Sequence, residues 1–317
     1  MLIKPRLSWL AAALLIAGSG TPALAASAAA KTNAAAGKTL SSAELIAQSP
    51  DSEWRPLAPE NTLLMELPQG QVLIELAPRF APRHVANIRA LAQGGFYDGL
   101  AIVRVQDNFV AQWGDPNADE AGLAKPLSAG ASAKIPAEFS LPLKNIPKAD
   151  FARLPDLDGW APLTGFVDGF PVAANPKTGQ AWMAHCYATV GAGRSDAVDS
   201  STGAELYAVI GQAPRGLDLN ITVVGRVLKG IELLASLQRG GPNMGFYDKA
   251  EQRTSILRLR LLADIPVAER PALQVLRTDG KTWPQLLQSR RSRGGWFVHQ
   301  HQHVDLCGLN VPTRAAK

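Results

Sequence analysis

Three histidines alternate with glutamines near the end of the sequence, at His299, His301 and His303. On a β-strand, alternate residues lie on one face, which is the arrangement a metal ion needs from neighbouring ligands. No cysteine or carboxylate pattern completes a ligand set beside them. A polar strand face is the favoured interpretation, and we assign no metal site to these residues.

A glycine-rich stretch, Gly191-Ala192-Gly193-Arg194-Ser195, has the composition of a phosphate-binding loop. It lacks the Gly-Lys-Ser/Thr ending of a P-loop and the third glycine of a dinucleotide-binding fingerprint. Ser195 beside Asp196 does not form the nucleophile elbow of a serine hydrolase. The stretch therefore predicts a loop, without nucleotide binding or a nucleophilic serine.

The sequence contains two cysteines, Cys186 and Cys307. In an oxidising compartment they could form a disulfide, and two buried free thiols fit the sequence equally well. His185 precedes Cys186, but successive residues of a strand point to opposite faces. No neighbour therefore marks either cysteine as a catalytic thiol.

Composition places the chain among ordinary globular proteins. Its 317 residues are 46% hydrophobic and 19% charged, with a formal net charge of +5. The basic residues are scattered, and only Arg290, Arg291 and Arg293 lie close together. A solvated basic face is favoured over a nucleic-acid site, and we expect no nucleic-acid partner.

The N-terminus has the pattern of a secretory signal peptide. Lys4 and Arg6 precede an apolar run over residues 7–18, and Ala23-Leu24-Ala25 is a small-x-small cleavage site. We predict a signal peptide at residues 1–25 and an Ala-rich leader or linker at 26–60. No later run is long enough to span a membrane, so the mature protein is expected in the periplasm or secreted, without a membrane partner.

The patterning after residue 60 predicts mainly β structure. Helical spacing occurs after Pro82 and again at residues 231–237. From 117 to 178 the chain is rich in Pro, Gly, Asp and Ala, which predicts long surface loops with a short strand near 138–141. Strands are expected at residues 63–67, 71–76, 101–105, 109–113, 181–190, 205–210, 222–227 and 256–262. After Pro266 we expect a C-terminal extension (266–317) with a helix at 283–290 and a strand at 296–306.

Two groups of motifs resemble the cyclophilin family. The first runs GQVLIEL (70–76), APRHVAN (81–87), GFYDGL (95–100), VRV (103–105) and NFVAQWGDP (108–116). The second runs TGAELYAVI (202–210) and TVVGRV (222–227). The resemblance covers about residues 61–263, and we assign 61–265 to this domain. It implies a closed eight-stranded antiparallel barrel capped by two helices, with the loop-rich middle inserted in it.

The resemblance also implies an activity, peptidyl-prolyl cis/trans isomerisation, with proline-containing polypeptides as substrates and no cofactor. Arg104 matches the family's catalytic arginine, and Gln112 matches the glutamine that orients it. The substrate-binding positions, by the same matching, are Phe109, Val110, Ala184, His185, Glu205, Tyr207, Leu217 and Ile221.

Several of these positions depart from the family pattern. Tyr207 stands where the family has a phenylalanine, and Glu205 where it has a glutamine. Gly216 and Ile221 replace a tryptophan and a histidine at the pocket rim. These departures motivate an alternative function, a catalytically weak cyclophilin-like module that binds peptides or acts as a chaperone.

Overall fold

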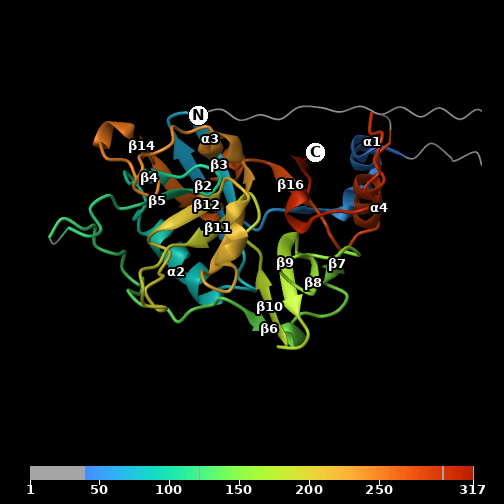
Figure 1. The fold of residues 1–317 in the computed structure, drawn as a ribbon. Coiled ribbons are helices and arrows are strands. Elements are labelled where there is room, and N and C mark those ends of the chain that lie inside the picture. The colour runs from blue at the N-terminus through green and yellow to red at the C-terminus, as the bar shows by residue number, and fades with distance from the viewer. Residues whose placement is uncertain (1–39, 121, 295, 317) are drawn as a thin grey trace, which may run out of the picture. The chain divides into compact units, whose positions relative to one another are not determined.

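The structure is a computed structural model that describes residues 40–120, 122–294 and 296–316, which are mainly β (Figure 1). The predicted signal peptide lies outside these residues. The largest sheet has nine strands in the order β14-β4-β5-β12-β11-β13-β3-β2-β15. Its strands are β2 (Thr62–Leu67), β3 (Gly70–Leu76), β4 (Ala101–Val105), β5 (Val110–Gly114), β11 (Thr189–Ala192), β12 (Leu206–Val209), β13 (Val223–Lys229), β14 (Thr254–Ser255) and β15 (Arg258–Leu261).

The two edges of this sheet belong to one stretch of chain. β14 pairs with β4 and β15 pairs with β2, and only Ile256 and Leu257 separate the two edge strands. Ile256 N–H donates to Leu100 O at 2.7 Å, and Leu257 N–H donates to Glu66 O at 2.8 Å. The sheet has nine strands instead of the expected eight because this stretch divides into two short strands at opposite edges.

The main hydrophobic core lies on one face of this sheet. Strand alternation sends Ala111 and Trp113 of β5 into this core, and Leu206 and Ala208 of β12 join them. Helix α2 (Pro82–Gln93) adds its apolar side chains, and α3 (Ile231–Ala235) adds Leu234. Pro82 occupies the first turn of α2 and Gly94 caps its end, as the sequence predicts. α3 is two residues shorter than expected.

The region predicted as long surface loops contains a second sheet. Its order is β6-β10-β9-β8-β7, and Figure 1 shows it in green in the lower part of the view. The loop prediction for residues 117–178 is therefore wrong over the strands, where apolar residues such as Phe166 and Val172 are buried. The strands are β6 (Leu141–Pro142), β7 (Ala152–Arg153), β8 (Leu163–Val167), β9 (Phe170–Asn175) and β10 (Gln180–Met183).

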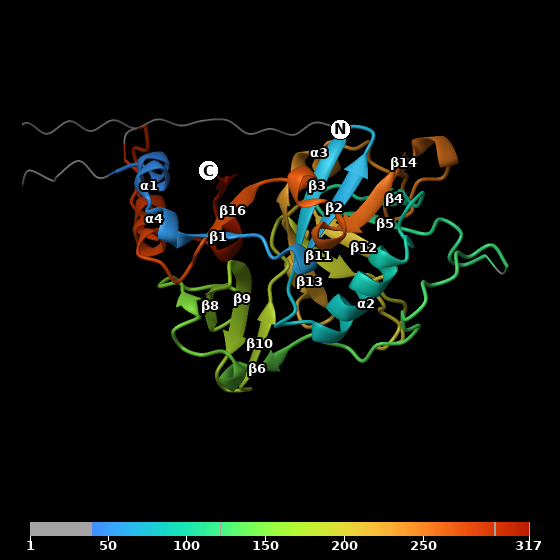
Figure 2. The ribbon, with the colours of Figure 1, turned by 180° about the vertical axis from the view of Figure 1, so that it is seen from behind.

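The predicted leader and the C-terminal extension meet in a third sheet. β16 (Leu273–Leu276) pairs with β1 (Trp54–Pro56) on one side and with β17 (Thr313–Ala315) on the other. Helices α1 (Ser42–Gln48) and α4 (Thr282–Arg291) lie side by side, as Figures 1 and 2 show. A capping box between Ser41 and Glu44 begins α1. The strand predicted at 296–306 is wrong, because the described residues of this segment form no strand.

Short 3-10 helices connect the larger elements. The one that bears on the site is η4 (Ala213–Leu217), which follows β12. The others are η1 (Asp51–Glu53), η2 (Pro59–Asn61), η3 (Leu143–Asn145), η5 (Ala250–Gln252), η6 (Leu262–Asp264), η7 (Val267–Glu269) and η8 (Leu306–Gly308). Within the described ranges, no helix combines the length and apolarity needed to cross a membrane.

Candidate active site

Three predicted site residues lie in one row across neighbouring strands. Arg104 of β4 is paired with Gln112 of β5, and Gln112 is paired with Tyr207 of β12. Gly191 of β11 continues the row beyond Tyr207. Because side chains alternate along a strand, Gln112 and Tyr207 point away from the main hydrophobic core that holds Ala111 and Trp113. Arg104 reaches the same outer face through the β-bulge between Ile102 and Arg104, because Ile102, two residues earlier on β4, points into the core.

The guanidinium of Arg104 is held on three sides. Its Nε donates to Met244 O at 2.7 Å, its Nη1 donates to Gln112 Oε1 at 3.0 Å, and its Nη2 donates to Gln106 Oε1. Its Cζ lies 5.4 Å from the ring centroid of Phe109 and 5.1 Å from that of Phe246. A guanidinium has five N–H donors, so two remain for a substrate. Burial lowers the pKa of Arg104, and Glu205 partly opposes that shift; an arginine nevertheless stays charged.

Gln112 connects Arg104 to Glu205. While its Oε1 accepts from Arg104, its Nε2 donates to Glu205 Oε1 at 2.5 Å. Both contacts fix the orientation of the amide, since its oxygen faces a cation and its nitrogen faces a carboxylate. Burial raises the pKa of Glu205, and the hydrogen bond from Gln112 offsets only part of the rise.

An apolar cluster lies beside the arginine. Val110, Tyr207 and Val209 are buried together, and Phe109, Leu217 and Ile221 pack against them while partly exposed. Strand alternation explains two members, because Tyr207 and Val209 are two residues apart on β12. The structure therefore brings together five of the eight predicted substrate-binding positions, and it adds Val209.

The other predicted positions lie in different places. Ala184 is fully buried in a second hydrophobic core, separate from the main one, with Phe166 and Trp182. His185 lies behind the apolar cluster, with its Nε2 at 2.9 Å from the hydroxyl oxygen of Tyr207. Glu205 lies beside Gly193, whose N–H donates to Glu205 O at 2.8 Å. The backbone nearest to Glu205 on the neighbouring strand is thus 192–193, and not 184–185.

A comparison with models of protein families assigns the chain to one of them. The family model described as "Cyclophilin type peptidyl-prolyl cis-trans isomerase/CLD" matches residues 62–260. The chain belongs to the cyclophilin family.

Relatives and solved structures agree with this family. A crystal structure of the cyclophilin AquaCyp293 from Hirschia baltica superposes with a TM-score of 0.66 at 25% identity, covering 83% of this chain and 94% of that one. A "Probable peptidyl-prolyl cis-trans isomerase" of Brucella suis biovar 1 (strain 1330) is 44% identical over 87 residues, 26% of this chain and 44% of the relative. "Peptidyl-prolyl cis-trans isomerase-like 2" of Gibberella zeae is 45% identical over 58 residues, 18% of this chain and 10% of the relative. The chain spans less than half the length of these curated relatives.

Sequence reasoning missed the residues of this cyclophilin that hold Arg104 from the other side. Gln106 lies two residues after Arg104 on the chain, and period-two alternation was the available signal for it. Met244 and Phe246 come from a loop that is distant in the sequence. Met244 lies 140 residues after Arg104. Phe246 forms an isolated β-bridge with Arg104, which no local pattern predicts. In the described residues, no group of three His, Cys, Asp or Glu side chains is arranged to hold a metal ion.

Proposed function

We propose that this cyclophilin is a peptidyl-prolyl cis/trans isomerase that acts on proline-containing polypeptides. The observation that carries the proposal is the fixed guanidinium of Arg104 beside the apolar cluster of Val110, Tyr207 and Val209. The distance of 5.4 Å from Arg104 Cζ to the Phe109 ring places the charge at the edge of that cluster.

The chemistry requires little beyond this arrangement. Rotation about an X-Pro bond has a barrier of roughly 18–20 kcal/mol, because the planar amide is stabilised by resonance. In the twisted amide the proline nitrogen regains a lone pair, to which the free N–H groups of Arg104 can donate. The apolar cluster holds the pyrrolidine ring while the preceding residue turns. Gln112 keeps the guanidinium in place, so little reorganisation is needed during rotation.

The test compares Arg104→Ala with wild type in the isomerisation of a short X-Pro peptide. We expect a loss of roughly 100-fold or more in kcat/KM, as for removal of other transition-state donors. Arg258→Ala is the matched control, because Arg258 is an exposed strand arginine at the sheet edge. If wild type does not accelerate isomerisation but binds the peptide, the alternative of a peptide-binding module replaces this proposal.

We also propose that the nine-stranded sheet acts as one closed eight-stranded barrel. The support is the continuous stretch from β14 to β15, whose residues Ile256 and Leu257 bond to the strands at both edges. Closure would remove the free edges of an open sheet and give the row of site residues a rigid support.

We propose in addition that the protein is exported, to the periplasm or beyond. The pattern of residues 1–25 supports export, and so does the disulfide between Cys186 and Cys307, a bond typical of oxidising compartments. The mature protein from fractionated cells should begin at Ala26 and contain no free thiol. Full-length protein with reduced cysteines in the cytoplasm would contradict export.

A further inference from the structure

Tyr207 brings a hydroxyl group to the back of the apolar cluster. The residue is almost completely buried, so its hydroxyl needs a partner inside the protein. His185 supplies that partner, with Nε2 at 2.9 Å from the Tyr207 oxygen and the two rings nearly parallel, at an angle of 13° with their centroids 6.2 Å apart. Burial and the charge of Asp218 raise the pKa of Tyr207, so the hydroxyl keeps its proton.

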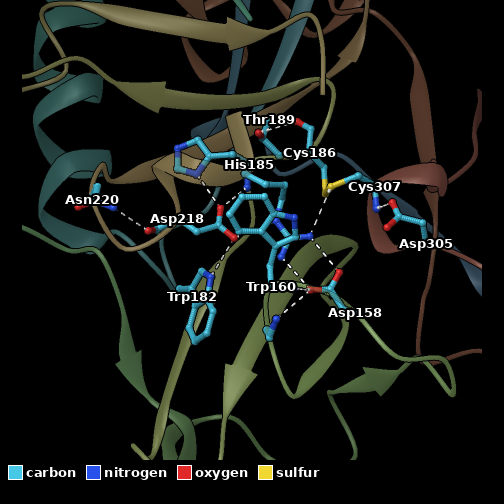
Figure 3. A network of polar contacts seen from close by, with 12 residues as sticks. Asp158, Trp160, Trp182, His185, Cys186, Thr189, Asp218, Asn220, Asp305 and Cys307 are labelled. Carbon is cyan, nitrogen blue, oxygen red and sulfur yellow. Dashed lines mark hydrogen bonds and ion pairs between the residues drawn. A yellow bond between two sulfur atoms is a disulfide. The ribbon is translucent and has the colours of Figure 1, made fainter. Parts of the chain in front are cut away.

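His185 is fixed in turn by Asp218. The carboxylate oxygen Oδ1 of Asp218 accepts from the backbone N–H of His185 at 2.9 Å, and it lies 3.0 Å from Nδ1 of the same residue (Figure 3). Burial alone would raise the pKa of Asp218, but the hydrogen bonds from His185 and the charge of Arg215 lower it overall. Because an ionised carboxylate only accepts, Nδ1 is assigned as the donor, and in the neutral imidazole Nε2 is then the acceptor for the Tyr207 hydroxyl.

Asp218 is held by Arg215 of η4 and by the region inserted before β11. Its Oδ2 accepts from Arg215 Nε at 2.9 Å and from Trp182 Nε1 at 3.2 Å. The other two nitrogens of Arg215 donate to both oxygens of Asp158, each at 3.1 Å. Asp158 lies between β7 and β8, and Trp182 lies on β10 of the second sheet. The chain of contacts therefore runs from the second sheet to the apolar cluster.

The disulfide adds a covalent restraint at the same place. Cys186 follows His185 directly and is bonded to Cys307 of η8 (Figure 3). Cys186 is buried in the second core, with Trp182 and Leu306. The backbone of His185 is thus tied to the C-terminal segment as well as to Asp218.

We propose that His185 is a positioning residue that holds Tyr207 as the wall of the proline-binding pocket, and that the second sheet and the C-terminal segment act on the pocket through it. The proposal rests on the proposed function. It assigns the inserted region a role in substrate binding without any contact of its own with the substrate. A pocket wall contacts proline in the ground state and the transition state alike, so its displacement raises KM and leaves kcat nearly unchanged.

The experiment measures kcat, KM and the calorimetric Kd of one X-Pro peptide for His185→Leu, His185→Gln, Tyr207→Phe and the double variant His185→Leu/Tyr207→Phe. His185→Leu leaves the Tyr207 hydroxyl unsatisfied, and we expect KM to rise roughly tenfold with kcat within about twofold of wild type. His185→Gln offers a new acceptor and should restore KM to within about threefold. In the Tyr207→Phe background, the effect of His185→Leu should fall below about threefold, since no hydroxyl remains to be satisfied.

The matched control is His84→Gln. His84 is also a fully buried histidine with its Nδ1 on a carboxylate, 2.7 Å from Glu138 Oε2, but it lies on α2. The His84→Gln substitution should lower the melting temperature without changing KM. An equal effect of His185→Leu in both backgrounds, or a loss of active fraction with unchanged KM, would overturn the proposal.

The outcomes of this experiment distinguish a failure of this inference from a failure of the proposed function. If the wild type binds the peptide without accelerating isomerisation, the isomerase activity is refuted, and the same ordering of variants is then read from Kd. A wild-type protein that neither binds nor isomerises the peptide overturns both.

Discussion

Glu205 places a negative charge two hydrogen bonds away from Arg104. Its carboxylate accepts from Gln112, which itself accepts from Arg104. Burial raises the pKa of Glu205; Gln112 and Arg104 oppose the rise, and Asp119 adds to it. A carboxyl group whose pKa is higher in the folded than in the unfolded state favours folding below its unfolded pKa. That contribution is lost as pH rises through the folded pKa.

Glu205→Gln should therefore stabilise the protein at neutral pH. The glutamine oxygen can still accept from Gln112, while the cost of the buried charge disappears. The melting temperature at pH 7–8 should rise above that of wild type, and the difference should shrink as pH falls below the folded pKa of Glu205. Thermal unfolding over a pH series measures this, and a gain that grows towards acid pH would contradict it.

The position of Gly191 beside Tyr207 in the row of site residues requires a residue without a side chain. A Cβ on Gly191 would lie 2.2 Å from the Cζ and hydroxyl oxygen of Tyr207, which belong to a rigid ring. The absent side chain therefore leaves the space that Tyr207 occupies on the neighbouring strand. The strand pairing of β11 with β12 sets this contact.

Gly191→Ala should displace Tyr207 and cost about 1–3 kcal/mol of stability, as overpacking does elsewhere. KM for an X-Pro peptide should rise along with the loss of stability. Gly159→Ala is the matched control, because a Cβ there meets no atom within 4 Å. Denaturant titration and kinetics measure both effects. An unchanged KM in Gly191→Ala would show that Tyr207 is not part of the pocket wall.

The stretch from β14 to β15 leads to a prediction about hydrogen exchange in the large sheet. If it closes the sheet, the amide protons of Ile256 and Leu257 are protected by Leu100 and Glu66 and exchange only when the barrel opens. Native-state hydrogen exchange should place them among the slowly exchanging amides of the sheet. Rapid exchange at both positions would indicate an open sheet.

The sequence predicts the site strands well and the inserted region poorly. β4, β5 and β12 are short apolar runs with turn signals on both sides, and Arg104, Gln112 and Tyr207 follow from their motifs. The five-stranded sheet has weak periodicity, because β9 carries Pro171 and two alanines and is buried over most of its length. The contact of His185 with Tyr207 depends on how these segments pack, 22 residues apart, and no local pattern contains it.

At the scale of the whole molecule, the disulfide between Cys186 and Cys307 joins two segments that are far apart in the sequence. The disulfide joins residues 121 positions apart, and it connects the segment between β10 and β11 to the C-terminal segment. In the chain-entropy account, a loop of this length stabilises the folded state by roughly 4–5 kcal/mol, although engineered and natural cases range lower.

Cys186→Ala/Cys307→Ala should therefore lower the free energy of unfolding by about 2–5 kcal/mol. Denaturant titration with and without a reductant measures the change. Reduced wild type should match the double variant, and the double variant should not respond to the reductant. A difference below about 0.5 kcal/mol would mean that the tail is held by packing alone.

The row from Arg104 to Tyr207 crosses three adjacent strands, which lie about 4.8 Å apart, so its length is about 10 Å. An extended peptide advances about 3.3 Å per residue, and roughly three residues are needed for a substrate that runs along the row. Affinity should consequently climb with ligand length up to about a tripeptide and level off beyond it, which makes ligand length an internal ruler for this surface.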